Sequence, residues 1–196
     1  FPATAGRVFN SRSSVGVRGI RLQGDDKVVS MSIIRHFEAE AEERAAYLKM
    51  RRAMAGLSDE AENEDDDAVT PGAISQERYA EMSAAENLIL TITAKGSGKL
   101  SSSHDYPVRG RGGMGVAAMD KAMRGGPLVT SFPVEMSDQI MLVTSTGQSI
   151  RVPIEGISFR SRGAGGVKVF DTAKKETVVS VAWIADQGED EDVEDS

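Results

Sequence analysis

The chain has 196 residues, no cysteine and a formal net charge of −7. Its apolar content of 40% can support one core or a short array of small sheets, and no run of 18 apolar residues is present to span a membrane. The lack of cysteine excludes disulfides and thiolate metal sites and fits a cytoplasmic location. Residues 1–6 have no signal-peptide pattern and no initiator methionine, so we interpret the chain as part of a longer protein.

The net charge is divided unevenly along the chain. Residues 1–36 carry +4 and residues 87–185 carry +5, whereas residues 37–86 carry −9 and residues 186–196 carry −7. A basic module with two acidic appendages is therefore expected, and such a module is suited to anionic partners.

Residues 1–36 predict a partial blade of a larger array. Two β-branched stretches, 17–22 and 28–34, are expected as strands joined at the turn Gly24-Asp25-Asp26.

Residues 37–86 predict an acidic helical insertion. Ala, Glu, Arg, Leu and Met recur at helical spacing over 37–54, six polar or acidic residues over 62–67 end that pattern, and Ser75 can cap a second helix running to Met82. Because its charge opposes that of its surroundings, we expect this insertion to face solvent.

Residues 87–138 and 139–185 predict two blades of four short strands each. The strand and turn patterns of the first recur 51 residues later, so that Thr93 corresponds to Thr144 and Gly96 to Gly147. The tail 186–196 is acidic and aperiodic and is expected to be disordered. Because it is tethered, it could compete with an anionic partner for the basic blades.

One motif, Arg-x-x-x-Gly-Val, organises the repeats. It begins at Arg12, Arg111 and Arg162, and each copy is followed by a β-branched strand pattern. With the insertion removed, the period is about 50 residues, as in propeller-like arrays whose units bury their apolar faces against one another. The predicted fold class is all-β, a propeller-like array of four-stranded blades with an α-helical acidic insertion.

Two sequence patterns resemble catalytic motifs but favour plainer interpretations. Residues 110–115 match G-x-G-x-x-G, yet Gly125-Gly126-Pro127 stops the helix that a dinucleotide site needs. Ser103-His104-Asp105 is expected to be a polar turn, because catalytic triads assemble in space. With His36 as the only other imidazole, no His-rich metal site is expected, and no metal or cofactor is assigned to this chain.

Basic residues gather near the repeated turns and are the candidate ligands for phosphate. The alternative is that an Arg in a repeat binds only the neighbouring blade. The candidate DNA-binding residues are Arg12, Arg18, Arg21, Lys99, Arg109, Arg111, Lys121, Arg151, Arg160, Arg162 and Lys168.

At these residues the sequence resembles the C-terminal domain of the DNA gyrase A protein. The resemblance is carried by 16–22 with 26–30, by Asp138-Gln139-Ile140-Met141, and by Ile157-Ser158 before Arg162. It implies a β-pinwheel whose basic perimeter bends DNA, of which this chain holds the last blades.

The family's wrapping box, Gln-Arg-Arg-Gly-Gly-Lys-Gly, would by this resemblance precede Phe1. Residues 109–115 form a blade turn of the same type, with Arg109, Gly110 and Met114 in place of Gln, Arg and Lys. Leu100 stands where the family usually has Arg, whereas Arg151 keeps that position in the next blade.

The resemblance further implies double-stranded DNA as a partner and a role in an ATP-dependent type IIA topoisomerase that introduces negative supercoils. It implies the gyrase B protein as a partner in an A2B2 assembly, ATP and Mg²⁺ elsewhere in the enzyme, and no catalytic residue here, since Tyr47, Tyr79 and Tyr106 have no matching context. Two alternatives stay open: the related protein of topoisomerase IV, and a propeller that binds proteins and not DNA.

Overall fold

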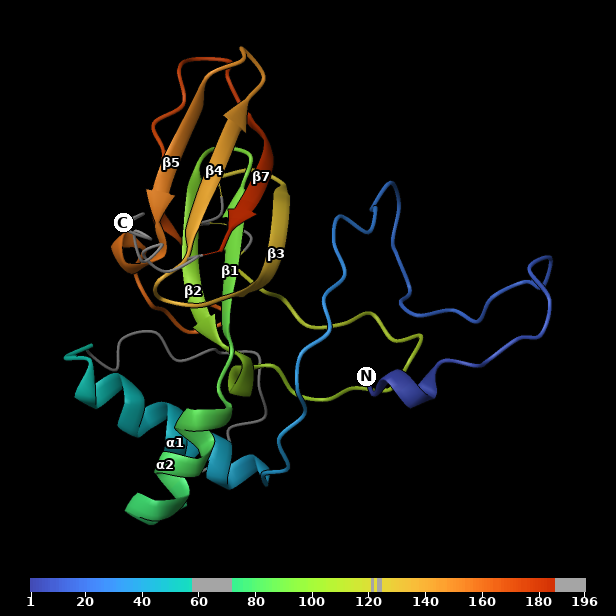
Figure 1. Cartoon of the computed structure of the whole chain (residues 1–196), viewed down its shortest axis with the longest axis vertical. Helices are drawn as coiled ribbons and strands as arrows, with labels where there is room; N and C mark the ends of the chain where they lie inside the picture. Colours follow the sequence, from blue (N-terminus) through green and yellow to red (C-terminus); the bar gives the residue numbers. More distant parts are fainter. Residues whose placement is uncertain (58–71, 121, 123–124, 186–196) are drawn as a thin grey trace, which may run out of the picture.

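The computed structural model describes residues 1–57, 72–120, 122 and 125–185, and it contains two antiparallel sheets (Figure 1). The first sheet has the strand order β3-β1-β2-β6 and the second has the order β5-β4-β7. The strands are β1 (Leu88–Thr93), β2 (Ser97–Ser102), β3 (Leu128–Val134), β4 (Gln139–Thr144), β5 (Ser149–Pro153), β6 (Val167–Lys168) and β7 (Val178–Ile184).

One hydrophobic core joins the two sheets. Leu90, Ile92 and Leu100 from the first sheet pack with Ile140 and Leu142 from the second, and all of them are buried. The sequence of β1, Leu-Ile-Leu-Thr-Ile-Thr, suits this place because β-branched and large aliphatic side chains fit a strand covered on both faces. The all-β prediction is confirmed.

The turn after the first strand of each unit has the same geometry in both units. The backbone N–H of Gly96 donates to the Thr93 carbonyl and that of Gly147 to the Thr144 carbonyl, each at 3.0 Å, and both glycines have positive φ, 76° and 86°. At Gly96 a side chain is also excluded by space, because a Cβ atom there would lie 2.3 Å from the Phe170 carbonyl oxygen. The structure confirms the expected correspondence between the two units.

The later unit contributes one strand to the sheet of the earlier unit. β6 begins at Val167, the last residue of the third copy of the repeat motif, and it pairs with β2 of the preceding unit, with Lys168 opposite Ser97. Phe159 also forms a parallel bridge with Leu100 of β2. The expectation of four strands from each unit holds for residues 139–185, which contain β4, β5, β6 and β7, but the described part of 87–138 contains only β1, β2 and β3. The first sheet gains β6 from the next unit, which leaves three strands in the second sheet.

The N-terminal segment differs from the sequence prediction. Residues 17–22 and 28–34 form no strand, the only helical element before residue 41 is the 3-10 helix Ala3–Ala5, and Met31 and Ile33 are 87% and 84% exposed. A β-strand forms only where a neighbouring strand can pair with its backbone N–H and C=O groups. β3 and β7 pair with strands that begin 40 and 39 residues earlier, whereas residues 28–34 have no such partner among the described residues.

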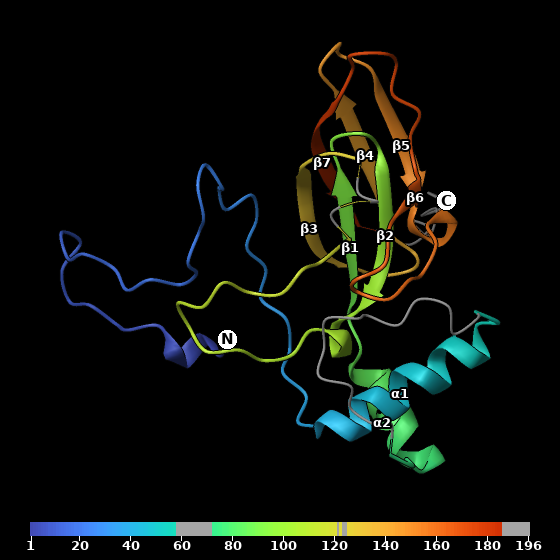
Figure 2. The same ribbon diagram turned by 180° about the vertical axis from the view of Figure 1, so that it is seen from behind.

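The insertion forms two helices, as expected. α1 (Ala41–Met54) begins at a capping box in which Glu40 and Glu43 satisfy each other's backbone N–H groups. α2 (Gln76–Ala85) begins at Ser75, whose hydroxyl accepts from the Arg78 backbone N–H. Both helices lie at one end of the sheets (Figures 1 and 2).

The helices do not simply face solvent. Tyr47 and Met82 are fully buried, the Tyr47 ring packs edge-on against His104 at 5.1 Å, and His104 Nε2 donates to the Met82 carbonyl at 2.8 Å. His104 lies in the 3-10 helix Ser103–Asp105, which corresponds to the 3-10 helix Ile154–Gly156 in the next unit. The expectation of a solvent-facing insertion is therefore corrected: its inner face packs on a blade.

Some predictions concern residues outside the described part of the chain. These are the acidic stretch 62–67, Lys121 and the tail 186–196. Among the residues that are described, no helix has the length and apolar character needed to cross a bilayer.

Candidate nucleic-acid interface

Three repeated turns lie next to one another and form what we call the turn row, defined as residues 12–21, 109–117 and 160–168. The first two are joined by backbone hydrogen bonds from Gly112 N–H to the Gly19 carbonyl at 2.7 Å and from Arg21 N–H to the Gly113 carbonyl at 2.8 Å. The N-terminal segment and residues 106–120 accordingly run together beside the sheets (Figures 1 and 2).

The first residue of the motif, an arginine, makes the same contact in two repeats. The Arg111 guanidinium donates to the Arg18 carbonyl at 2.8 Å, and the Arg162 guanidinium donates to the Ala117 carbonyl. Arg18 and Ala117 each directly follow the Gly-Val of the preceding copy. The motif arginine therefore links each turn to the one before it, as the alternative to phosphate binding supposed.

Arg162 is buried, with 3% of its surface exposed. Its Nε donates to the Asp105 carbonyl oxygen at 2.9 Å, and its backbone N–H donates to the Asp105 carboxylate at 2.6 Å. Burial raises the pKa of Asp105, and the hydrogen bond and charge of Arg162 oppose that shift. The prediction that Arg162 contacts DNA is corrected, because its guanidinium is engaged inside the protein.

Lys99 is also buried. Its ammonium donates to the carbonyls of Ser161 at 2.6 Å, Ala164 at 2.7 Å and Arg162, so it holds the third turn against β2. Burial lowers the pKa of Lys99 to about 7, while the nearby Asp105 carboxylate acts in the opposite direction. The assignment of Lys99 as a DNA ligand is therefore also corrected.

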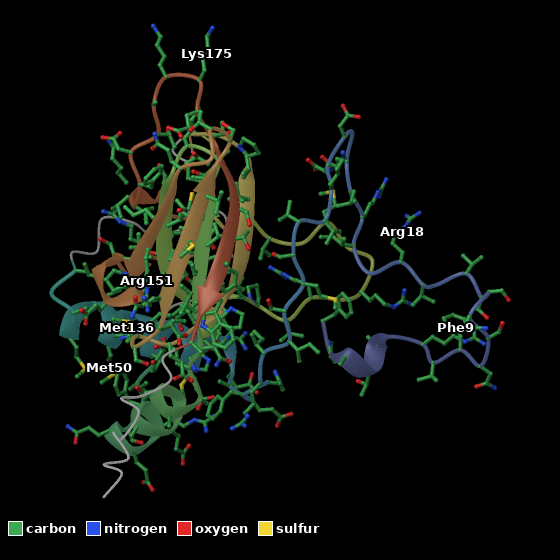
Figure 3. The ribbon with its side chains drawn as sticks, turned by 45° about the horizontal axis from the view of Figure 1, so that its top comes forward. Phe9, Arg18, Met50, Met136, Arg151 and Lys175 are labelled. Atoms are coloured by element: carbon green, nitrogen blue, oxygen red, sulfur yellow. The ribbon has the colours of Figure 1, made fainter. Side chains whose placement is uncertain are left out.

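The remaining described candidates are exposed. Arg111 is partly occupied by its contact with Arg18, and Lys168 forms an ion pair with Asp171 at 3.1 Å. Figure 3 shows Arg18 on the N-terminal segment, well away from the sheets. The exposed set is Arg12, Arg18, Arg21, Arg109, Arg111, Arg151, Arg160 and Lys168.

Leu100 and Arg151 occupy corresponding positions but differ in burial. Leu100 is buried, and its backbone bonds to Ser158 and Arg160 as the third turn covers β2. Arg151 lies on β5, which forms an edge of its sheet, and its side chain is exposed. An apolar side chain at position 100 therefore suits a covered strand.

Ser103, His104 and Asp105 lie in one 3-10 helix, and the last two make structural contacts. In the described residues, no group of three or more His, Asp or Glu side chains could hold a metal ion. His104 bonds to the insertion and Asp105 to the third turn, so Ser103-His104-Asp105 forms no triad. Sequence reasoning missed Asp105 as the anchor of Arg162, and only its position at the end of the 3-10 turn could have suggested a role.

The geometry thus defines a class: an array of small antiparallel sheets with basic turns arranged in a row. A family model described as "DNA gyrase C-terminal domain, beta-propeller" matches residues 9–35, 87–129 and 138–182, which is more than half of the chain. The chain belongs to this family. The matched ranges omit both helices of the insertion.

Curated relatives agree with this membership. The chain is 44% identical to the DNA gyrase A protein of Granulibacter bethesdensis over 95% of its length, and 38% identical to that of Rickettsia bellii over its whole length. It spans 22% and 21% of those proteins, about a fifth of their length. A solved structure of a DNA gyrase A C-terminal domain is similar at 23% identity with a TM-score of 0.47, covering 51% of this chain and 34% of that one.

Proposed function

We propose that this chain binds double-stranded DNA along the turn row and bends it. The observation that carries the proposal is the set of exposed arginines and lysines on consecutive, mutually bonded turns. Such residues neutralise phosphates and release counterions without reading bases. At Gly110 no neighbouring atom lies within 4 Å of the position of a Cβ, so a phosphate can approach the backbone there.

The bonded turns make bending energetically feasible. Bending 20 to 30 base pairs strongly costs about 1–6 kcal/mol, and several phosphate contacts can offset that cost if the protein keeps its shape. Lys99 and Arg162 support that requirement, since they tie the third turn to β2 and to the second turn. Their buried charges thus serve DNA bending indirectly, by holding the exposed residues in place.

The names of the relatives support a wider assignment for the whole protein. Within such a protein this chain would be the DNA-wrapping part of a type IIA topoisomerase that supercoils DNA in the cytoplasm. ATP and Mg²⁺ would then be used elsewhere in the enzyme, together with the gyrase B protein in an A2B2 assembly. The chain itself would supply no catalytic residue.

The test is a bending measurement on a duplex of about 30 base pairs with a fluorescent label at each end. Binding should bring the labels closer together, equally for duplexes of unrelated sequence. Binding with no change in the distance between the labels would contradict bending. No salt-dependent binding at all would favour the protein-binding alternative.

A further inference from the structure

The insertion is acidic as a whole, but its charge is sharply divided. Residues 44–57 contain Arg44, Lys49, Arg51 and Arg52 and no acidic residue. The carboxylates lie before Arg44, within 59–67, or from Glu77 onward. The C-terminal half of α1 is therefore a basic segment inside an acidic insertion.

This basic segment is fixed beside the residue that precedes the third turn of the row. The Arg51 guanidinium lies 4.3 Å from the centre of the Phe159 ring and forms an ion pair with Glu86 at 2.8 Å. Phe159 directly precedes Arg160, whose backbone N–H is bonded to the Leu100 carbonyl at 2.8 Å. One helical turn earlier, Tyr47 packs on His104. Two anchors on one face therefore hold α1 beside the loop that carries Arg160.

With Arg51 engaged, Lys49 and Arg52 are the other basic residues in the C-terminal half of α1. Lys49 is exposed, and Arg52 is half-buried with its Nε bonded to the Leu48 carbonyl at 3.2 Å. The charge of Arg52 acts on Asp105, which bonds to the third turn. Residues three apart are neighbours on a helix surface, so Lys49 and Arg52 form one patch.

Stabilisation of the helix end can account for Arg52 but not for Lys49. Basic residues in the last turn of a helix interact favourably with its dipole, and Arg51 and Arg52 stand there. Lys49 stands before the last turn and remains exposed. In Figures 1 and 2 the C-terminal half of α1 lies on the same side of the molecule as β5, the strand that carries Arg151.

We propose that α1 extends the DNA-binding surface, with Lys49 and Arg52 contacting the phosphate backbone next to the contacts of Arg160. This inference rests on the proposed function, since it lengthens the same surface. The insertion then has two parts with different roles: its inner face attaches to the blade, and the Lys49–Arg52 patch contacts DNA. The ligand is the same as in the proposed function: double-stranded DNA that is recognised through its phosphates and not through its base sequence.

The experiment compares two charge-removing pairs in the whole 196-residue chain. The test variant is K49Q/R52Q. The matched control is K174Q/K175Q, which removes two exposed charges at the end of the sheets far from the helices, where Figure 3 labels Lys175. The affinity for a duplex of random sequence is measured as a function of salt concentration.

For K49Q/R52Q we expect the slope of log affinity against log salt to flatten by about one to two units, with affinity about 8-fold weaker per lost contact at about 0.1 M salt. The control should keep the slope of the unaltered chain, and K49R/R52K should restore the binding lost in the glutamine pair. K49Q alone should flatten the slope by about half as much. Because Lys49 is exposed, this single variant also shows whether the effect of the pair comes from misfolding.

Two results would overturn the inference, and they are distinguishable. If the unaltered chain binds DNA with a steep salt slope while K49Q/R52Q behaves like the control, α1 is no part of the surface and the proposed function stands. If the unaltered chain shows no salt-dependent binding, the proposed function fails and the inference fails with it.

Discussion

Arginine has two separate roles in the repeats, and burial decides which role each one has. The guanidinium of Arg162 donates hydrogen bonds to the carbonyls of Asp105 and Ala117, whereas Arg160, two residues earlier, is exposed. Arg111 is intermediate, exposed but bonded to the Arg18 carbonyl. A planar guanidinium carries five N–H donors in a fixed fork, so the single Arg162 side chain reaches the carbonyls of two separate segments.

We therefore expect the same substitution to have unequal effects at equivalent positions. R162K should lower the free energy of unfolding by about 1–3 kcal/mol, because a buried carbonyl loses its donor. R111K, at the exposed equivalent, should cost less than about 1 kcal/mol. Urea unfolding of both variants measures the difference. Equal small losses would show that the Ala117 contact does not stabilise the array.

Glu176 gives a prediction about pH. It is buried, and its pKa is lowered from 4.5 because the hydroxyls of Thr144 and Thr146 and the Ala173 backbone N–H donate to its carboxylate. The unfolded chain then binds the proton more readily, so this contribution to stability is complete above pH 4.5 and is lost as pH falls through the lowered pKa. E176Q should be less stable at about pH 7 and should lose less further stability between about pH 5 and pH 3. Parallel acid unfolding curves for the two proteins would disprove the assignment.

At the scale of elements, the packing of the insertion is the feature with the clearest energetic consequence. Met82 is fully buried where α2 meets His104. M82A should therefore destabilise the chain by about 2–5 kcal/mol, as truncations of buried methionines do. M54A, the same change at a residue of α1 that is 75% exposed, is the control and should be nearly neutral. Thermal unfolding compares them. A neutral M82A would restore the view that the insertion only faces solvent.

Sequence patterns predicted the elements whose cause is local. β1 and β4 were predictable because Leu88–Thr93 and Gln139–Thr144 are rich in aliphatic and β-branched residues, and α2 was predictable because Ser75 can cap a helix. Residues 28–34 have an equally good strand pattern but form no strand, since within the described residues they have no ladder partner. A strand propensity is fulfilled only where a second strand can accept its hydrogen bonds.

The candidate site was predictable in kind but not residue by residue. The repeat showed that basic turns recur, and the turns are indeed adjacent. It could not show that Lys99 is buried, because the carbonyls that bind its ammonium lie 62 to 65 residues away in the sequence. Lys99 between Gly98 and Leu100 has the same sequence appearance as a lysine on an open strand. Contacts between repeats decide the role of each basic residue, and one sequence does not contain that information.

For the whole molecule, charge and architecture support one account. The segments 1–36 and 87–185 are both basic, and the three turns of the row fall within them. The acidic segments are the insertion and the residues after Ala185. A rigid array with basic turns on consecutive units can hold DNA along a curved path, whereas the same charges on a flexible chain would bind it without fixing its shape.

The most direct test of this account is the salt dependence of duplex binding by a variant that lacks three exposed arginines, R18Q/R151Q/R160Q. These side chains are exposed, and none is needed for the buried contacts around Lys99 and Arg162. The account predicts a slope of log affinity against log salt that is flatter by about two to three units than that of the unaltered chain, equally for duplexes of unrelated sequence. An unchanged slope, with the variant still folded, would contradict the claim that the exposed arginines of this array bind DNA phosphates.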